Sequence, residues 1–245
     1  MAAANVHVRN ALLEALAPRA GDVVLELAGG TGELAEALAP RVAQVIYTDF
    51  SPAMVAAAKR RGIPGVEHLV LDMQAIDLPD GSVDGVVCRY GYMLVPDPAR
   101  ALRETRRVLR RGGRLALATW AAARRNPWAT RFGPVLIERG LLEPPAPGEP
   151  GQFALSEPEQ IEALLRGAGF EDVEVEEVPV DFRFADWEHY RRIVTSLASS
   201  LRETLAGLDE VDRAAVDEAV RARFEPFAGP SGYALPGVAL VARAV

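Results

Sequence analysis

The sequence predicts an α/β protein whose core is a doubly wound, mostly parallel sheet of seven strands. Short apolar runs alternate with amphipathic stretches from residue 23 to residue 119, which is typical of successive strand–helix–strand units. A glycine-rich turn, residues 28–32, joins the first apolar run directly to a helix. Single carboxylates, Asp49 and Asp72, end the second and third runs, at the edge where parallel sheets bind ligands.

Length and composition describe a globular chain that needs no covalent cross-links. The 245 residues are 49% hydrophobic and 25% charged, and the formal net charge is −7. A chain of this size buries most of its apolar surface. The single cysteine, Cys88, excludes an intrachain disulfide and a cysteine-rich metal centre, and His7, His68 and His189 form no metal-binding pair. The acidic balance argues against a nucleic-acid partner.

The N-terminal residues and the apolar runs of the chain indicate where in the cell the protein is expected. The first ten residues lack a basic stretch followed by an apolar core, so we expect no signal peptide. The longest apolar run, around residues 115–123, is too short to cross a bilayer. These features predict a cytoplasmic protein without a membrane span.

The first half of the chain contains most of the alternating pattern. Residues 5–17 place apolar side chains at helical spacing, and Pro18 and Gly21 end this helix. Ser51 and Pro52 form an N-cap and first-turn pair for the helix after the second strand. The predicted strands of this half are 23–27, 42–48, 66–71, 83–88 and 114–119. The predicted helices are 33–39, 53–61 and 98–110, the last one ended by Gly112 and Gly113.

The second half breaks the alternation. A proline-rich loop covers residues 142–150, and Ser156 with Glu159 marks the start of a helix over 156–167. A sixth strand is expected around 173–180 and a last, antiparallel strand at 238–245. Between them, about 183–232, we expect a helical insertion over the strand ends. It contains two amphipathic helices, 187–206 and 209–224.

The turn at residues 28–32 is the most informative segment. Glycines let the backbone approach a ligand closely, and the helix that follows points its first N–H groups toward that ligand. The turn alone leaves the ligand open. Residues 30–35 also fit the G-x-G-x-x-A pattern of dinucleotide-binding proteins, and a glycine turn without any ligand is the plainest alternative.

Two carboxylates make a nucleoside ligand the better interpretation. Asp49 at the end of the second strand offers two acceptor oxygens to the two hydroxyls of a ribose. Asp72 at the end of the third strand can accept a hydrogen bond from the exocyclic amine of an adenine. With Glu26, these residues are expected at one rim of the sheet.

At this point the sequence resembles a known family, the class I S-adenosylmethionine-dependent methyltransferases, in particular the small-molecule branch called methyltransferase type 11 or UbiE-like. The matching segments keep the family's order and spacing and cover about residues 20–120. They are LELAGGTG at 25–32, YTDFSPAM at 47–54, LDMQAIDLP at 71–79, SVDGVV at 82–87, PDP at 96–98 and RETRRVLRRGGR at 103–114. The resemblance implies a Rossmann-like fold.

The resemblance also implies roles for the residues at the strand ends. The methionine part of the cofactor would lie against the first turn, at Glu26, Ala28, Gly29, Gly30 and Gly32. The adenosine part would lie against Asp49 at the ribose, Phe50 and Met54 beside the adenine, and Asp72 with the Met73 backbone at the adenine edge. Arg89 would line the methionine and methyl end. Ala28 departs from the family glycine, and an alanine there is expected to have a negative φ.

The resemblance divides the chain into an N-terminal helix, 1–20, a cofactor-binding half, 21–120, and an acceptor-side half, 121–245, all within one methyltransferase domain. Tyr90 and Tyr92 follow the fourth strand as substrate wall or as loop packing. His7 and His189 are candidate acceptor-side groups or ordinary helix-surface histidines. Trp128 belongs to a set of aromatic residues that suit either an apolar acceptor pocket or the core.

These inferences lead to a methyltransferase that uses S-adenosyl-L-methionine, releases S-adenosyl-L-homocysteine and acts on a small organic acceptor at oxygen, carbon or nitrogen. No convincing general base or metal-binding cluster is present, so alignment of the two reactants is the main expected catalytic factor and no catalytic residue is named. A non-catalytic cofactor-binding or interaction protein, with the helical insertion as a homodimer face, is one alternative. An NAD(P)-dependent oxidoreductase is another, although Lys59 is the only lysine and no Tyr-x-x-x-Lys pair exists.

Overall fold

The computed structural model describes residues 2–144, 146, 148–197 and 199–245 and contains one mixed sheet. The strands follow the order β3-β2-β1-β4-β5-β8-β6, and a short β7 pairs with β8. Strands β1 to β5 run parallel to one another, and β8 is antiparallel to both β5 and β6. The strands are β1 (Val23–Leu27), β2 (Gln44–Asp49), β3 (Val66–Val70), β4 (Val83–Arg89), β5 (Leu109–Trp120), β6 (Glu174–Phe184), β7 (Ala228–Gly229) and β8 (Gly232–Ala244).

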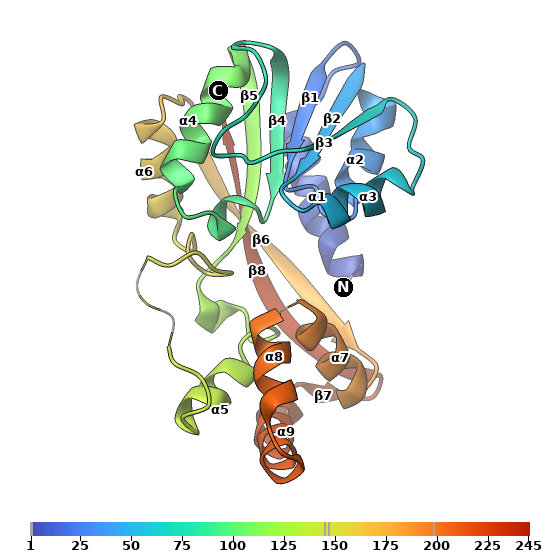
Figure 1. Cartoon of the computed structure of the whole chain (residues 1–245), viewed down its shortest axis with the longest axis vertical. Coiled ribbons are helices and arrows are strands. Elements are labelled where there is room, and N and C mark those ends of the chain that lie inside the picture. The colour runs from blue at the N-terminus through green and yellow to red at the C-terminus, as the bar shows by residue number, and fades with distance from the viewer. Residues whose placement is uncertain (1, 145, 147, 198) are drawn as a thin grey trace.

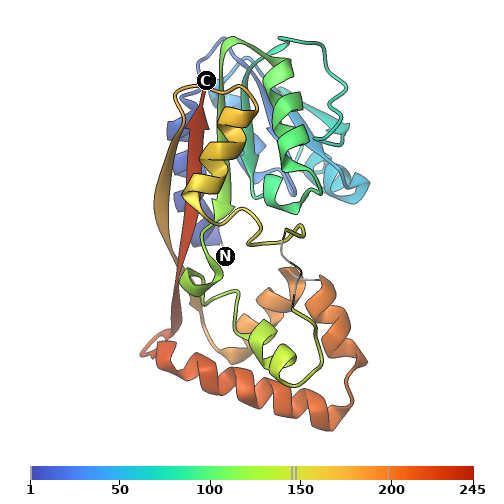
Figure 2. The ribbon, with the colours of Figure 1, turned by 90° about the vertical axis from the view of Figure 1, so that its left-hand side faces the viewer.

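The predicted doubly wound, Rossmann-like sheet with a last antiparallel strand is confirmed, and β7 is the one strand that was not predicted. The helices of the sheet half are α1 (Ala2–Leu16), α2 (Glu33–Leu38), α3 (Pro52–Lys59), α4 (Pro98–Val108) and α6 (Pro158–Gly167). Helix α1 packs on β4, β5, β6 and β8, while α4 and α6 pack on each other. Figure 2 shows α4 and α6 in front of these strands and α1 behind them.

A helical lobe lies beyond the carboxyl ends of the parallel strands (Figure 1). It consists of α5 (Phe132–Glu138), α7 (Trp187–Leu197), α8 (Ser199–Gly207) and α9 (Glu210–Phe224). The predicted helix over 187–206 is therefore divided in two, and α5 was not predicted. Stacked and edge-on rings fill the lobe, among them Phe132, Phe184, Tyr190 and Phe224. None of the described helices is both long enough and apolar enough to cross a membrane.

Two groups of element boundaries differ from the prediction for identifiable structural reasons. Helix α4 ends at Val108, and the glycine pair lies inside β5 instead of ending the helix. The β4–β5 register shifts there, from Val83 opposite Leu109 to Gly85 opposite Arg114, so the glycines form a β-bulge. Strands β6 and β8 are longer than predicted because they continue past the sheet as a two-stranded ribbon that carries the lobe (Figure 1).

Candidate functional site

The glycine turn after β1 is folded against β2. The Gly29 N–H donates to the Thr48 carbonyl at 2.9 Å, and the Tyr47 hydroxyl donates to the Gly30 carbonyl. A Cβ on Gly29 would overlap with the Tyr47 ring. Gly32 has a φ of +82° and opens α2, a conformation that favours glycine. The turn therefore needs glycine at Gly29 for space and at Gly32 for its backbone angle.

Ala28 also adopts the left-handed region, with a φ of +52°. The expectation of a negative φ at this position is wrong. The chain must reverse between the buried end of β1 and the Gly29–Thr48 hydrogen bond, and this reversal places Ala28 where the family has glycine. A left-handed non-glycine residue costs roughly 1–2 kcal/mol. The turn keeps its shape at the expense of this local strain.

Asp49 connects the turn to the end of β2. One carboxylate oxygen accepts from the Gly30 N–H at 2.9 Å, and the other accepts from the Ser51 N–H at 2.8 Å. Each oxygen retains a free lone-pair direction for a ligand hydroxyl. Phe50 and Met54, which follow on the loop and on α3, are 75% and 42% exposed although both are large and apolar. An exposed apolar pair beside an oriented carboxylate suits the base and sugar of a nucleoside.

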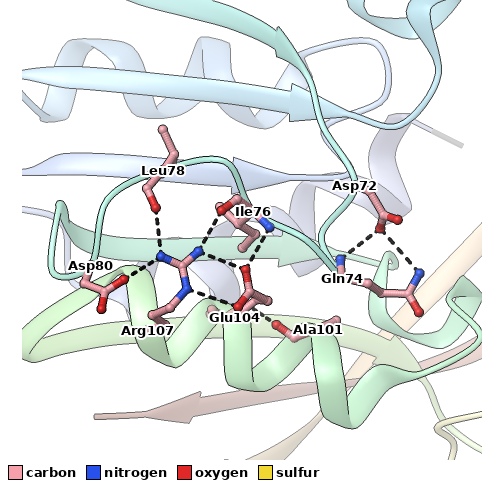
Figure 3. A network of polar contacts seen from close by, with 9 residues as sticks. Asp72, Gln74, Ile76, Leu78, Asp80, Ala101, Glu104 and Arg107 are labelled. Atoms are coloured by element: carbon pink, nitrogen blue, oxygen red, sulfur yellow. Dashed lines mark hydrogen bonds and ion pairs between the residues drawn. The ribbon is translucent and has the colours of Figure 1, made fainter.

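Asp72 follows β3 in a loop that α4 holds in place. Its Oδ1 accepts from the Gln74 N–H at 2.8 Å, and Met73 is buried. Figure 3 shows Arg107 of α4 donating to the carbonyls of Ile76 and Leu78, at 2.6 and 2.8 Å. Glu104 accepts from the Ile76 N–H at 2.9 Å, and its hydrogen bond with Arg107 lowers the pKa of its carboxyl. The loop thus has fixed backbone positions beside Asp72.

Three buried side-chain atoms at the ends of β1 and β4 have no hydrogen-bond partner among the described residues. They are Glu26 Oε2, Arg89 Nη1 and the Tyr90 hydroxyl. Burial raises the pKa of the Glu26 carboxyl to about 8, although Arg89 opposes this shift. Arg89 also forms a 3.2 Å ion pair with Glu33 at the start of α2. Nine buried side-chain atoms of the described residues are unpaired in all. Since buried polar groups are almost always paired, the three at these strand ends are candidates for contacts with a ligand that has both donors and acceptors.

Two of the predicted acceptor-side residues are buried and packed against other side chains. Tyr92 is 1% exposed and its hydroxyl lies 2.6 Å from the Thr105 hydroxyl, which agrees with packing, the second of the two interpretations of this residue. Trp128 is 3% exposed and stacks on Phe182.

Both candidate histidines lie on helices, His189 on α7 and His7 on α1. His189 Nδ1 accepts from the Ala185 N–H at 3.2 Å at the start of α7, at the far end of the β6–β8 ribbon (Figure 1). This hydrogen bond fixes His189 as part of the turn that begins the helix. His7 is exposed on α1, as a helix-surface histidine would be.

Two residues that support the site were not identified from the sequence. Tyr47 packs under Gly29, and Glu33 pairs with Arg89. The only available signal for Tyr47 was its position two residues before Asp49, which places both side chains on one face of β2. The Glu33–Arg89 pair joins residues 56 apart in the chain, so no local pattern could indicate it.

Sheet order, turn and rim carboxylates together define a nucleotide-binding α/β protein of the methyltransferase type. The family model described as "Methyltransferase domain" matches residues 25–117. A demethylmenaquinone methyltransferase of Thermus thermophilus is 32% identical over 187 residues, 68% of this chain and 82% of that protein. The chain belongs to the class I S-adenosylmethionine-dependent methyltransferases, in the UbiE-like branch, whose cofactor is S-adenosyl-L-methionine.

Other comparisons define the extent of this relationship. A demethylmenaquinone methyltransferase of Beutenbergia cavernae is 40% identical over 121 residues, so the chain spans about half the length of that relative, 49%. The YcgJ protein of Bacillus subtilis has the same fold, with a TM-score of 0.66 and 19% identity over 98% of this chain and 97% of that one. Sequence similarity is thus strongest in the cofactor half, and the acceptor half shares the fold.

Proposed function

We propose that this protein transfers a methyl group from S-adenosyl-L-methionine to a small organic acceptor. The observation that carries the proposal is the set of unpaired buried groups at the ends of β1 and β4, close to the glycine turn. An amino-acid zwitterion complements two of them, since its ammonium group suits Glu26 and its carboxylate suits Arg89. The cofactor of this family carries such a zwitterion at its methionine end.

The remaining contacts follow from the positions of the rim residues. Asp49 would bind the ribose hydroxyls, and Phe50 and Met54 would cover the adenine. Asp72 and the Met73 backbone would read the adenine amino edge. Gly29, which has no space for a side chain, lies with its would-be Cβ 3.0 Å from Glu26 Cδ, so the backbone and this carboxyl meet at the methionine end. We propose each of these contacts separately, residue by residue.

The cofactor supplies an electrophilic methyl group on a sulfonium sulfur. The protein's contribution is to bind both reactants in line and to exclude water, and alignment of this kind accounts for a large part of rate enhancement. No residue is assigned as a general base. The printed names of the relatives, demethylmenaquinone methyltransferases, make quinols the first acceptors to test, with phenols and amines after them.

Calorimetric titration with S-adenosyl-L-homocysteine, and with NADH in a parallel run, tests the proposal. We expect micromolar binding of the first compound and none of the second. Binding of NADH alone would favour an oxidoreductase, and binding of neither would favour a non-catalytic interaction protein. A homodimer, a cytoplasmic location and the absence of a nucleic-acid partner stay predictions, and light scattering measures the first of them.

A further inference from the structure

Tyr90 combines two unfavourable features in one residue. Its φ is +67°, a left-handed conformation that is rare for a bulky side chain. Its hydroxyl is buried and forms no hydrogen bond with any described residue. Tyr92, two residues further on, shows neither feature, since its hydroxyl pairs with Thr105 at 2.6 Å. Strained backbone and unsatisfied polar groups that persist in a native fold concentrate at functional sites.

Strand β5 holds Tyr90 at both its backbone and its ring. The Tyr90 N–H donates to the Ala118 carbonyl at 2.8 Å. The ring stacks on Trp120, with the ring centroids 4.4 Å apart and an angle of 11° between the planes. Trp120 in turn contacts the ring of Trp128, at 5.0 Å. The backbone hydrogen bond and the ring stack therefore fix the position of the Tyr90 hydroxyl.

The sheet order places this hydroxyl on the acceptor side. Strands β2 and β3, which carry Asp49 and Asp72, lie on one side of β1, and β4 and β5 lie on the other. The nucleoside contacts are thus on the opposite side of β1 from Tyr90. Of the three unpaired groups, Glu26 and Arg89 suit the ammonium and carboxylate of the cofactor, which leaves the Tyr90 hydroxyl without a partner.

We propose that the Tyr90 hydroxyl binds the methyl acceptor and donates a hydrogen bond to an oxygen of a phenolic or enolic acceptor. The inference rests on the proposed function. Burial raises the pKa of Tyr90 well above its ordinary value, and Arg89 only partly opposes this shift, so the hydroxyl keeps its proton and acts as a donor. A fixed neutral donor stabilises negative charge on the acceptor oxygen.

The Tyr90 contact assists transfer of the methyl group from sulfur to the acceptor. The acceptor hydroxyl loses its proton to the solvent before the site closes, and the resulting anion holds its charge between oxygen and the conjugated carbon. One of these two atoms uses an electron pair to form the bond to the methyl carbon. If carbon forms the bond, its hydrogen then leaves to the solvent as a proton and the oxygen regains one. The electron pair of the carbon–sulfur bond stays on sulfur, which becomes the neutral thioether of S-adenosyl-L-homocysteine. The Tyr90 hydroxyl donates a hydrogen bond throughout and keeps its proton at the end of the step.

Paired variants separate this role from a structural one. Tyr90→Phe keeps the ring stack and removes an unsatisfied hydroxyl, so we expect a melting temperature equal to or above that of the wild type. Tyr92→Phe removes a paired hydroxyl from the core and is expected to melt at a lower temperature. Both variants should bind S-adenosyl-L-homocysteine as the wild type does. If Tyr90→Phe lowers the melting temperature as much as Tyr92→Phe does, the Tyr90 hydroxyl has a partner within the protein. That result would overturn the proposal.

Binding of a phenol to the protein saturated with S-adenosyl-L-homocysteine completes the test. The probes are 1-naphthol and naphthalene, which differ by the one oxygen. We expect the wild type and Tyr92→Phe to prefer 1-naphthol by about 10-fold or more, and Tyr90→Phe to lose most of that preference. No preference in the wild type, or an unchanged preference in Tyr90→Phe, overturns the inference. Failure to bind S-adenosyl-L-homocysteine instead contradicts the proposed function, so the two failures are distinguishable.

Discussion

The side-chain amide of Asn126 forms hydrogen bonds with both the N–H and the C=O of Val238, 112 residues further along the chain, at 3.0 and 3.1 Å. The same amide donates to the Ala121 carbonyl at 2.8 Å and accepts from the Trp128 indole at 3.1 Å. The last residue pair between β5 and β8 is Trp120 with Ala239. Asn126 thus adds to the backbone pairing of Val238, whose carbonyl also accepts from the Ala121 N–H at 3.0 Å, where β8 leaves the sheet for the helical lobe.

Replacement of Asn126 by alanine should therefore destabilise the joint between sheet and lobe. Asn126 is fully buried, so the variant removes the partner of the Val238 N–H, of the Ala121 carbonyl and of the Trp128 indole N–H. We expect the free energy of unfolding to fall by about 3 kcal/mol. Chemical denaturation measures this change. Asn10→Ala, on the exposed surface of α1, is the matched control, and equal stabilities of the two variants would contradict the role of the Asn126 amide.

Gly29→Ala should disrupt the cofactor turn. The added Cβ would overlap with the Tyr47 ring, and overpacking of this kind costs about 1–3 kcal/mol. We expect lower stability and a large loss of S-adenosyl-L-homocysteine binding. Gly133→Ala is the control, because Gly133 has a negative φ and no atom within 4 Å of its Cβ position. Calorimetry of both variants measures their affinity for S-adenosyl-L-homocysteine. Wild-type affinity in Gly29→Ala would contradict a close approach of the turn backbone to the cofactor.

Asp49→Ala tests the ribose assignment. The variant removes the acceptor for any ligand hydroxyl and also leaves the Gly30 and Ser51 N–H groups without their carboxylate. We expect the affinity for S-adenosyl-L-homocysteine to fall by about 100-fold or more and the free energy of unfolding to fall by about 1–2 kcal/mol. Glu67→Ala removes an exposed carboxylate from neighbouring β3 and should bind normally. Unchanged affinity of Asp49→Ala for S-adenosyl-L-homocysteine would show that Asp49 does not bind the ribose.

Phe50→Ala separates ligand binding from stability. Phe50 is 75% exposed, so its truncation should change the free energy of unfolding by less than about 0.5 kcal/mol. If the ring covers the adenine, the affinity for S-adenosyl-L-homocysteine should fall by about 10-fold. Val211, 76% exposed on α9, provides the control variant Val211→Ala. A Phe50→Ala protein that binds as tightly as this control would show that the ring does not touch the cofactor.

The buried Glu26 carboxyl predicts a pH dependence of stability. Its pKa is about 8 in the folded protein against 4.5 for the ordinary group. Between these values the unfolded chain has lost the proton while the folded protein retains it, so stability falls as pH rises and levels off above about pH 8. The slope approaches about 1.4 kcal/mol per pH unit. Glu26→Gln lacks this contribution, so urea unfolding of both proteins from pH 5 to 9 should give diverging curves, and parallel curves would contradict the prediction.

Much of the fold was predictable from local patterns. Strand β1, the glycine turn and α2 follow from one apolar run, a cluster of small residues and a helical repeat. Asp49 and Asp72 were placed at the rim because residues at the ends of neighbouring parallel strands meet at one edge. The boundaries of β5 were not predictable, because Gly112 can end a helix or form a bulge, and only pairing with β4 selects the bulge.

The candidate site was also predictable only in part, because some of its features are local in sequence and others are not. The sequence by itself determined that Glu26, Asp49 and Asp72 lie at or next to strand ends, since strand ends and turn chemistry are local properties of the chain, while the role of Arg89 was implied by the family resemblance. The tertiary structure alone decided that Tyr92 enters the core while Tyr90 keeps an unpaired hydroxyl, and that Ala28 takes a left-handed angle. These outcomes depend on packing and hydrogen bonding between segments far apart in the chain, and no local pattern encodes such contacts.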